Sequence, residues 1–435
     1  MKTLIRIAIA AALLVAAAPG QDVQTQVVGP AVNVPGIDKP VRVLRGRFTS
    51  GTLTLTNDTY WLLRGAVFFQ NTARLVIQPG TTIVGETATR GTLIIDRGAQ
   101  IIADGTREAP IVFTSDQPVG SRGRGDWGGL IINGRAPVNL PGGLGIGEGD
   151  TGAYGGSDPD DNSGILRYVR VEFAGIEFSP DNELNGIAFQ GVGRGTIVEN
   201  IQVTHNRDDG IEMFGGTVDI KRAVLTYIGD DSIDWTFGWS GRLQFAIVQQ
   251  RGDDADRGIE ADNNGNNNDL LPRSNPTIYN ITLVGDRSTT WGPESTTGMT
   301  LREGTAGTIR NAIVYGFKGN GIQVSTPATL AQAASGVLSV MNTIVFNNGT
   351  NLHSSTVAGI QLHAAGTLHQ VDPQLIAPTS FTAPVFRPAP GSPALTLAFA
   401  VPPNDGFFEM ARFIGALSDK IEEDWTLGWT NYADR

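Results

Sequence analysis

The chain has 435 residues, of which 43 are acidic and 32 are basic, so its formal charge at pH 7 is −11. This excess of acid argues against a nucleic-acid partner, and the absence of cysteine excludes disulfide frameworks, thiol catalysis and zinc sites built on thiolates. The 56 glycines and the charged fraction of only 17% favour an all-β protein with many turns.

The first predicted element is a leader over residues 1–20. It combines the basic Lys2 and Arg6 with an apolar stretch from Ile7 to Ala18 and a small residue at Gly20. This pattern predicts a secretory signal peptide, because the apolar stretch is too short to cross a bilayer. No later stretch approaches ~18 apolar residues, so no membrane span is expected. We therefore expect a secreted or cell-surface protein, with retention in the periplasm left open.

Residues 21–46 follow the leader with an extended pattern, and we expect them to cover the first coil of the fold as an N-terminal cap. Strand–turn–strand patterns recur through the N-terminal half, at Leu75–Ile83, Thr92–Ile102 and Pro110–Thr114, and Trp127–Ile132 starts another strand. Residues 139–163 are rich in Gly and Asp and predict a long side loop. A loop of this length is uncommon without a role in binding or assembly.

Internal repetition is the strongest pattern in the rest of the chain. Short β-rich runs share one shape, and their equivalent positions are spaced by 22, 23, 35, 31 and 31 residues: Asn200, Arg222, Phe245, Asn280, Asn311 and Asn342. A second motif, a small residue before an apolar alternation, recurs between them at Gly186, Gly210, Ser232, Gly258, Gly298 and Gly321. Each unit therefore carries at least two short strands separated by turns.

Strands this short cannot each bury their own apolar face. Stacking successive units solves the problem, because each strand then pairs with its counterpart about 4.8 Å away and the apolar side chains form one continuous column. We therefore predict a right-handed parallel β-helix over residues 47–396, with residues 397–435 capping its C-terminal end. An antiparallel sandwich or propeller is the competing fold, but sandwich strands usually recur every 8–12 residues.

The repeated coils resemble the right-handed parallel β-helix superfamily that includes pectate lyases and polygalacturonases. Two stretches, Asn342–Gly349 and Phe386–Ala394, resemble the last coils of many secreted bacterial β-helix proteins. Three more resemble a widespread, largely uncharacterised exported group: residues 125–132, residues 167–175 and the ending Asp424–Trp429. The resemblance implies the fold and export, and it says little about activity, because function depends on sites rather than folds.

Acidic residues recur at the spacing of one coil. The pairs Asp208-Asp209, Asp230-Asp231 and Asp253-Asp254 are 22 and 23 residues apart, and Glu212, Asp234 and Glu260 lie on the strands that follow. Strand alternation should turn these last three side chains out of the core. We expect them to line a solvent-facing ligand groove together with Gln190, Arg302 and Gln323.

Stacked carboxylates repel one another, so a cation or close hydrogen bonding must offset the cost. Calcium suits such a column, because it prefers six to eight oxygen ligands. The predicted metal ligands are Asp208, Asp230, Asp253, Asp254 and Asp262, helped by the oxygens of residues 263–268. No other cofactor is expected. The simpler interpretation is that Asp and Asn occupy turns, where they accept backbone N–H bonds.

A catalytic interpretation rests on a partial resemblance. Residues 206–211 and 229–233 resemble the first two acidic motifs of polygalacturonases, which implies Asp209, Asp230 and Asp231 as catalytic candidates. The later glycine–histidine–glycine motif of that family is missing, because the next coil offers Gly252–Ala255 without histidine, and its arginine–x–lysine element is not found. Lyase chemistry would need an ordered basic cluster, which does not emerge from Arg242, Arg257 and Arg302.

The leading hypothesis is a non-enzymatic exported β-helix that binds glycan along its long face or assembles through its ends. A polysaccharide hydrolase that uses the Asp pairs is the first alternative. The second is a filament or surface-layer subunit, in which residues 21–46 add a strand to a neighbouring molecule.

Overall fold

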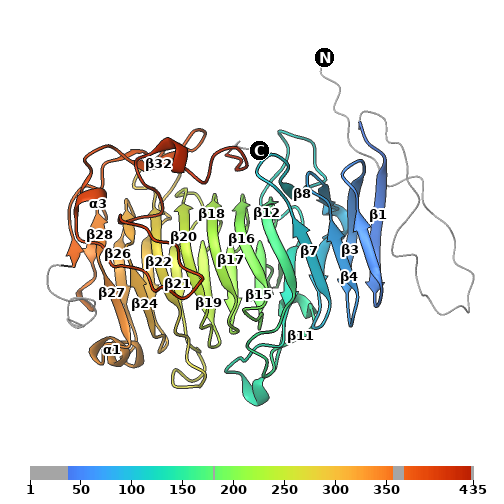
Figure 1. Cartoon of the computed structure of the whole chain (residues 1–435), viewed down its shortest axis with the longest axis horizontal. Coiled ribbons are helices and arrows are strands. Elements are labelled where there is room, and N and C mark those ends of the chain that lie inside the picture. Colours follow the sequence, from blue (N-terminus) through green and yellow to red (C-terminus); the bar gives the residue numbers. More distant parts are fainter. Residues whose placement is uncertain (1–37, 180–181, 356–366, 433–435) are drawn as a thin grey trace, which may run out of the picture.

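The computed structural model describes residues 38–179, 182–355 and 367–432. Twenty-six of the strands join one continuous sheet, and every pairing within that sheet is parallel. Figure 1 shows these strands stacked beside one another along the long axis of the molecule. The fold is therefore an all-β parallel β-helix, as the repeat predicted.

The strands of the β-helix are short, and most have four to eight residues. In the N-terminal part they are β1 (Val41–Phe48), β2 (Thr52–Leu55), β3 (Tyr60–Phe69), β4 (Arg74–Ile77), β5 (Thr82–Gly85), β6 (Thr92–Ile95), β7 (Gln100–Asp104), β8 (Ile111–Ser115), β9 (Gly129–Asn133) and β12 (Gly164–Glu172). In the middle they are β15 (Ile187–Gln190), β16 (Ile197–Thr204), β17 (Ile211–Phe214), β18 (Asp219–Thr226), β19 (Ile233–Thr236), β20 (Arg242–Gln249), β21 (Arg257–Ala261), β22 (Thr277–Val284) and β23 (Thr297–Leu301). The last coils contain β24 (Gly307–Arg310), β25 (Ile313–Tyr315), β26 (Asn320–Val324), β27 (Leu338–Met341), β28 (Thr343–Phe346), β29 (Thr350–Leu352) and β30 (Leu368–His369).

The first repeated motif marks a corner of the coil. Its residues are ladder equivalents, and all have left-handed backbone conformations with φ between 51° and 62°: Asn200, Arg222, Phe245, Asn280, Asn311 and Asn342. A left-handed residue turns the chain sharply, and asparagine tolerates this conformation better than most residues. The spacing of the repeat therefore located the bend at which each coil changes direction.

The second repeated motif starts the neighbouring strand of each coil. The residues after it pair in parallel register, from Ile187 through Ile211, Ile233 and Ile259 to Met299. A small residue is needed just before them, because a Cβ on Gly210 would lie only 2.5 Å from the carbonyl oxygen of Ser232 on the next coil.

One continuous apolar core runs inside the coils, built from the inward Ile, Leu, Val and Phe side chains of successive strands. Smaller apolar clusters cover the outside. One of them lies between the coils and the side loop and contains Val138, Tyr154, Leu184 and Phe214. The side loop carries its own hairpin of β10 (Gly145–Ile146) and β11 (Ala153–Tyr154).

The C-terminal residues differ from the predicted end cap. After the hairpin of β31 (Leu375–Ala377) and β32 (Val385–Pro388), the chain returns along the side of the coils toward β12 (Figure 1). Amide side chains of the coils bind its backbone: Asn311, at a corner, bonds to Ala400, and Gln202, within β16, bonds to Asn431. The expectation of a cap over the last coil is thus corrected, because the coils offer a lengthwise row of hydrogen-bonding side chains.

The two tryptophans of this segment serve packing. Trp429 is 1% exposed and meets Tyr168 edge to face, with ring centroids 5.6 Å apart, and Trp425 is also buried. The helices are short, with α1 at Pro327–Ala334 and α3 at Pro393–Thr396. None of the helices in the described ranges is long and apolar enough to span a membrane.

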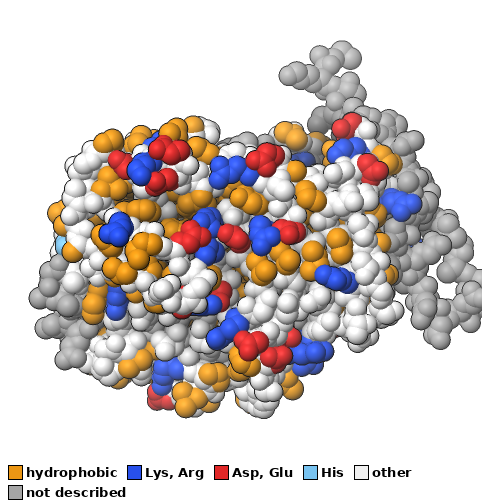
Figure 2. Space-filling view, in the orientation of Figure 1, with side chains coloured by type: hydrophobic (Ala, Val, Ile, Leu, Met, Phe, Trp, Pro, Cys, Tyr) orange, Lys and Arg blue, Asp and Glu red, His pale blue; other side chains and the backbone are white. Residues whose placement is uncertain are grey.

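The predicted signal peptide and most of the predicted N-terminal cap lie outside the described residues. Within residues 38–46, the chain already joins the β-helix, because β1 pairs in parallel with β3 from Val41 onward. On the face of the molecule seen in Figure 2, acidic and basic side chains lie interspersed among apolar ones.

Candidate functional site

Parallel register brings the predicted acidic residues together. Glu212 on β17 pairs with Asp234 on β19, and Asp234 pairs with Glu260 on β21. The same column continues through Thr300 to Gln323. We call Glu212, Asp234 and Glu260 the acidic ladder. The spacing of one coil therefore placed three carboxylates above one another, as the sequence indicated.

The acidic ladder is not the open groove that we predicted. Glu212 and Glu260 are each only 8% exposed, although both point away from the inner core. The side loop lies over this face, with Tyr154 packed against Phe214 at a ring distance of 6.2 Å. Strand alternation predicts only which side of the sheet a residue faces. It does not predict that a distant loop covers that side.

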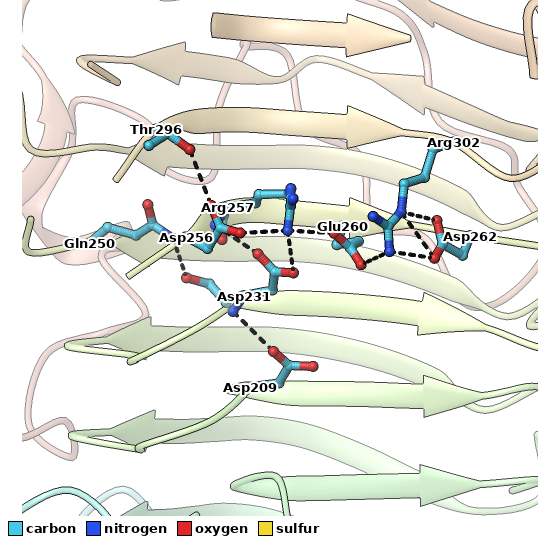
Figure 3. Close-up of polar contacts among 10 residues, drawn as sticks. Asp209, Asp231, Gln250, Asp256, Arg257, Glu260, Asp262, Thr296 and Arg302 are labelled. Carbon is cyan, nitrogen blue, oxygen red and sulfur yellow. Dashed lines mark hydrogen bonds and ion pairs between the residues drawn. The ribbon is translucent and has the colours of Figure 1, made fainter. Parts of the chain in front are cut away.

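Two arginines neutralise one end of the acidic ladder (Figure 3). Arg302 donates hydrogen bonds to Glu260 and to Asp262, the latter at 2.8 Å and 3.0 Å. Arg257 forms an ion pair with Glu260 at 2.6 Å and another with Asp256, also at 2.6 Å. Arg302 was predicted to line a groove, and Asp262 to bind metal, but here they pair with each other.

Asp209 and Asp231 join successive coils through the backbone. The Asp231 N–H donates to Asp209 Oδ1 at 3.0 Å, and the Arg257 N–H donates to Asp231 Oδ1 at 2.7 Å (Figure 3). These are the backbone bonds expected of aspartates in turns. Both side chains are buried, at 7% and 4% exposure. The two catalytic candidates are therefore engaged in holding the coils together.

A second column of acids runs beside the first, but its third member differs from the prediction. Asp208 and Asp230 are followed by Asp256, because Gly210, Ser232 and Gly258 are the true equivalents, as the backbone bonds between coils require. Counting back two residues from Gly258 would have located Asp256. Because the turn before β21 is longer, the pair Asp253-Asp254, which the regular spacing of 22 and 23 residues indicated, does not align with this column.

Asp253 and Asp254 lie elsewhere. Arg251 pairs with Asp253 at 2.7 Å, and Arg124 lies 3.3 Å from Asp253 and 3.6 Å from Asp254. Both predicted metal ligands therefore form ion pairs with arginines and lie away from the acidic ladder.

Three overlapping carboxylate groups each bring an oxygen of every member within 4.8 Å of the others. They are Asp208–Asp209–Asp230, Asp209–Glu212–Asp234 and Asp230–Asp231–Asp256. Each group has the composition of a hard-cation site, because carboxylate oxygens are the ligands that calcium and magnesium prefer.

Crowding raises the pKa values of these acids. Burial, and then the charge of Asp234, holds the pKa of Glu212 well above its ordinary 4.5. Burial, followed by the neighbouring carboxylates, raises the pKa of Asp208 to about 7. The pKa of Asp230 rises to about 6, first through burial and then through Asp256. Both causes disfavour the charged form of these carboxyls, so the negative charge of the cluster is poorly balanced by positive groups near neutral pH.

The side loop adds a further acid to this cluster. Glu148 of the loop lies close enough to Asp208 that burial, and then that charge, raises the pKa of Glu148 to about 8. Asn133 fastens the loop by donating to the Thr151 carbonyl oxygen at 2.9 Å. Gln190, predicted in the groove, is 1% exposed and lies two positions along the strand from the acidic column.

Sequence reasoning missed a separate pocket near the C-terminal coils. A cavity of about 330 Å³ lies between the loop after β22 and the residues around Phe381, and it is lined by Gly285, Asp286, Arg287, Ser288, Trp291, Tyr315, Gly316, Asn347, Thr379 and Phe381. The signal that could have found it is a tryptophan in a polar loop between two strands. We call this cavity the Trp291 pocket.

The aromatic side chain of the Trp291 pocket is held in place yet open to solvent. Trp291 is 44% exposed. The Arg251 guanidinium lies 4.6 Å from the centre of its ring, and Phe381 meets it edge to face at 6.0 Å. Arg287, also exposed, is fixed by bonds from Nη1 to the carbonyl oxygens of Asn347 and Asn348, at 2.9 Å and 3.0 Å.

Comparison with known families now adds to this geometry. A family described as a pectate-lyase-like beta-helix domain matches residues 46–375. The chain belongs to this family. A search of curated proteins finds no match. Among solved structures, the enzymatically active domain of tailspike protein 2 from bacteriophage CBA120 shares 12% identity and a TM-score of 0.31 with this chain. The alignment covers 72% of this chain and only 42% of that one.

Proposed function

We propose that this member of the pectate-lyase-like β-helix family is an exported, non-enzymatic protein that binds glycan at the Trp291 pocket. The observation that carries the proposal is a half-exposed tryptophan whose orientation is fixed, next to several polar side chains. A pyranose ring has an apolar face of C–H groups and a rim of hydroxyls, so it needs this combination of an aromatic surface and hydrogen-bonding groups.

The polar groups of the pocket divide into two roles. Asp286 shapes the loop, because its carboxylate accepts the N–H groups of Ser288 and Gly252 at 2.9 Å and 3.0 Å. Arg287 and Asn347 line the cavity beside Trp291 and are the groups that would hydrogen-bond sugar hydroxyls. Because the bonds to backbone oxygens already orient Arg287, little further ordering is needed on binding.

Two further points support the proposal. The family description names pectate lyases, whose substrates are polysaccharides, and the leader over residues 1–20 would place the protein where glycans occur. Assembly through residues 21–46 stays a prediction, because residues 21–37 lie outside the described part of the chain.

The test is a calorimetric titration of the full chain with hexasaccharides of cellulose, chitin and polygalacturonate. We expect at least one hexasaccharide to bind, and Trp291→Ala to weaken that binding by tenfold or more. Ile421→Ala is the matched control, since Ile421 is 60% exposed and lies outside the pocket. This variant should bind as the original chain does.

Two results would contradict the proposal. One is equal binding by the Trp291→Ala variant and the control, which would place any glycan elsewhere. The other is cleavage of a hexasaccharide, detected as shorter products after overnight incubation. Cleavage that is lost in Asp209→Asn or Asp230→Asn would favour the hydrolase alternative instead.

A further inference from the structure

We infer that a cavity on the outside of the N-terminal coils binds a small amphipathic carboxylate, whose apolar part lies on the sheet and whose charged end binds Arg122. We call this cavity the Arg122 pocket. Its volume is about 490 Å³, against about 330 Å³ for the Trp291 pocket. It is lined by residues of β1, β3, β5, β8 and β12, at the N-terminal end of the β-helix (Figure 1). The inference therefore does not depend on the proposed glycan binding.

The floor of the Arg122 pocket is apolar, because the strands beneath it place valines on their outer side. On β5, Val84 faces outward since its neighbour Ile83 lies in the core. On β8, Val112 faces outward beside the buried Phe113 in the same way. Both valines and Tyr60 of β3 line the pocket and are half-buried. A ligand that removes this apolar surface from water gains free energy.

The loop after β8 forms a wall of the Arg122 pocket and extends its apolar surface. Val119 on this loop lines the pocket and is 79% exposed. An exposed apolar side chain next to an apolar hollow makes one continuous patch, and such patches mark sites of interaction. The C-terminal residues that return along the coils line the pocket only through Asn431, so the described part of that segment leaves the valine floor uncovered.

Arg122 is the group that would bind the charged end of the ligand. Its Nε donates to the Gln117 carbonyl oxygen at 3.0 Å, and its Nη1 donates to Thr114 Oγ1 at 3.2 Å. These bonds fix the guanidinium, while its Nη2 donates no hydrogen bond within the described ranges. None of the ion pairs in the described part of the chain includes Arg122. A fixed guanidinium with an unused edge fits a carboxylate in both shape and charge.

The carboxylates that line the Arg122 pocket do not favour a cationic ligand, because they already have partners or are exposed to water. Glu172, 3% exposed, pairs with Arg170 at 3.2 Å and accepts two further hydrogen bonds. Asp116 Oδ1 accepts the N–H and the hydroxyl of Thr87, at 3.1 Å and 2.6 Å. Asp38 is exposed, so water and salt screen its charge. The charged group without a counter-ion is a single guanidinium, which matches a carboxylate rather than a dianionic phosphate.

The experiment measures the binding of three probes to the full chain by calorimetry: octanoate, octan-1-ol and octylamine. The probes share one apolar chain and differ in the head group, so their affinities isolate the contribution of charge. We expect octanoate to bind at one site and about tenfold more tightly than octan-1-ol, because a hydrogen bond to a charged group is stronger than a neutral one. Octylamine should bind most weakly.

Two variants test the place of binding. Arg122→Gln should weaken octanoate binding by about tenfold and leave octan-1-ol binding unchanged. Arg194→Gln is the matched control, since it removes the same charge from a side chain that is 49% exposed and lies outside the pocket. Val119→Asp should also weaken octanoate binding, because it sets a negative charge at the pocket. Val119 is exposed, so this change leaves the folded core intact.

Several results would overturn the inference. It fails if octanoate does not bind the full chain, if octanoate and octan-1-ol bind equally, or if Arg122→Gln binds octanoate as the Arg194→Gln control does. Octanoate that binds only after residues 21–37 are deleted would assign the pocket to that part of the chain instead. Trp291→Ala should bind octanoate as the original chain does, and a loss of binding there would place the site in the Trp291 pocket.

Discussion

Glu212 and Asp234 are direct ladder partners on adjacent coils, although they lie on opposite sides of a turn in the sequence. One oxygen of each lies within 4.8 Å of the other and of Asp209. Parallel stacking makes this unavoidable, because any residue type that recurs at the coil spacing becomes a column. The structure therefore gathers carboxyl groups at one place beneath the side loop.

The first prediction concerns pH. The pKa of Asp230 is raised to about 6, those of Asp208 and Glu260 to about 7, and that of Glu148 to about 8, chiefly by burial. In the unfolded chain these acids lose their protons near pH 4. The native state therefore holds more protons between about pH 4 and pH 8, and raising the pH through this window destabilises it.

Melting temperatures of the metal-free protein, measured in a chelator from pH 5 to pH 8.5, should fall as the pH rises. A melting temperature that stays constant or increases over this range in chelator would contradict the assignment of raised pKa values to the cluster.

The second prediction tests the arginine end of the acidic ladder. Arg302→Gln removes the bonds to Asp262 and Glu260 and leaves two carboxylates without that partner. We expect a loss of about 1–3 kcal/mol in the free energy of unfolding, measured with urea. Arg194→Gln is the matched control, because Arg194 is 49% exposed at its side chain and lies 3.7 Å from an exposed Asp160. A loss no larger than in the control would show that Arg302 is not needed for charge balance.

Much of the fold was predictable because each sequence repeat corresponds to one coil of the β-helix. Asn200 and its equivalents recur at a fixed place in each coil because the chain must bend there, and the φ of 56° at Asn200 shows the reason for the residue type. The ladder of Glu212, Asp234 and Glu260 followed from the same periodicity. Local spacing thus determines register, and register determines which side chains share a column.

What the sequence could not reveal arises from contacts between distant segments. The side loop packs Tyr154 against Phe214, on the strand that carries Glu212, and no periodic pattern predicts where a loop will dock. Asp256 was missed because the turn before β21 is longer, which shifts the equivalent position. The C-terminal residues were expected at the end of the β-helix, yet the amides of Gln202 and Asn311 bind them along its side.

The third prediction tests the tight stacking of the coils. Gly210→Ala would place a Cβ 2.5 Å from the Ser232 carbonyl oxygen, so the coils would have to move apart. We expect a loss of about 1–3 kcal/mol in the free energy of unfolding, the usual cost of overpacking. Gly123→Ala is the control, since its Cβ would meet only Asp126 Oδ1, at 3.8 Å. Equal stability of the two variants would argue against this register.

The fourth prediction concerns the returning C-terminal segment. Trp429 is 1% exposed, packs on Tyr168 and donates from Nε1 to the Trp425 carbonyl oxygen at 2.8 Å. Trp429→Ala should cost about 3–5 kcal/mol of unfolding free energy and expose the segment to protease. Leu427→Ala should do neither, because Leu427 is 45% exposed. Matching protease sensitivity in the two variants would mean that Trp429 does not anchor the segment.

The most direct measurement of the central claim is a crystal structure of the full chain soaked with the hexasaccharide that binds it most tightly. We predict a sugar ring stacked on the indole of Trp291, within hydrogen-bonding distance of Arg287 or Asn347. A map with no sugar in the Trp291 pocket, or with sugar bound only elsewhere on the surface, would contradict the claim that this pocket binds glycan.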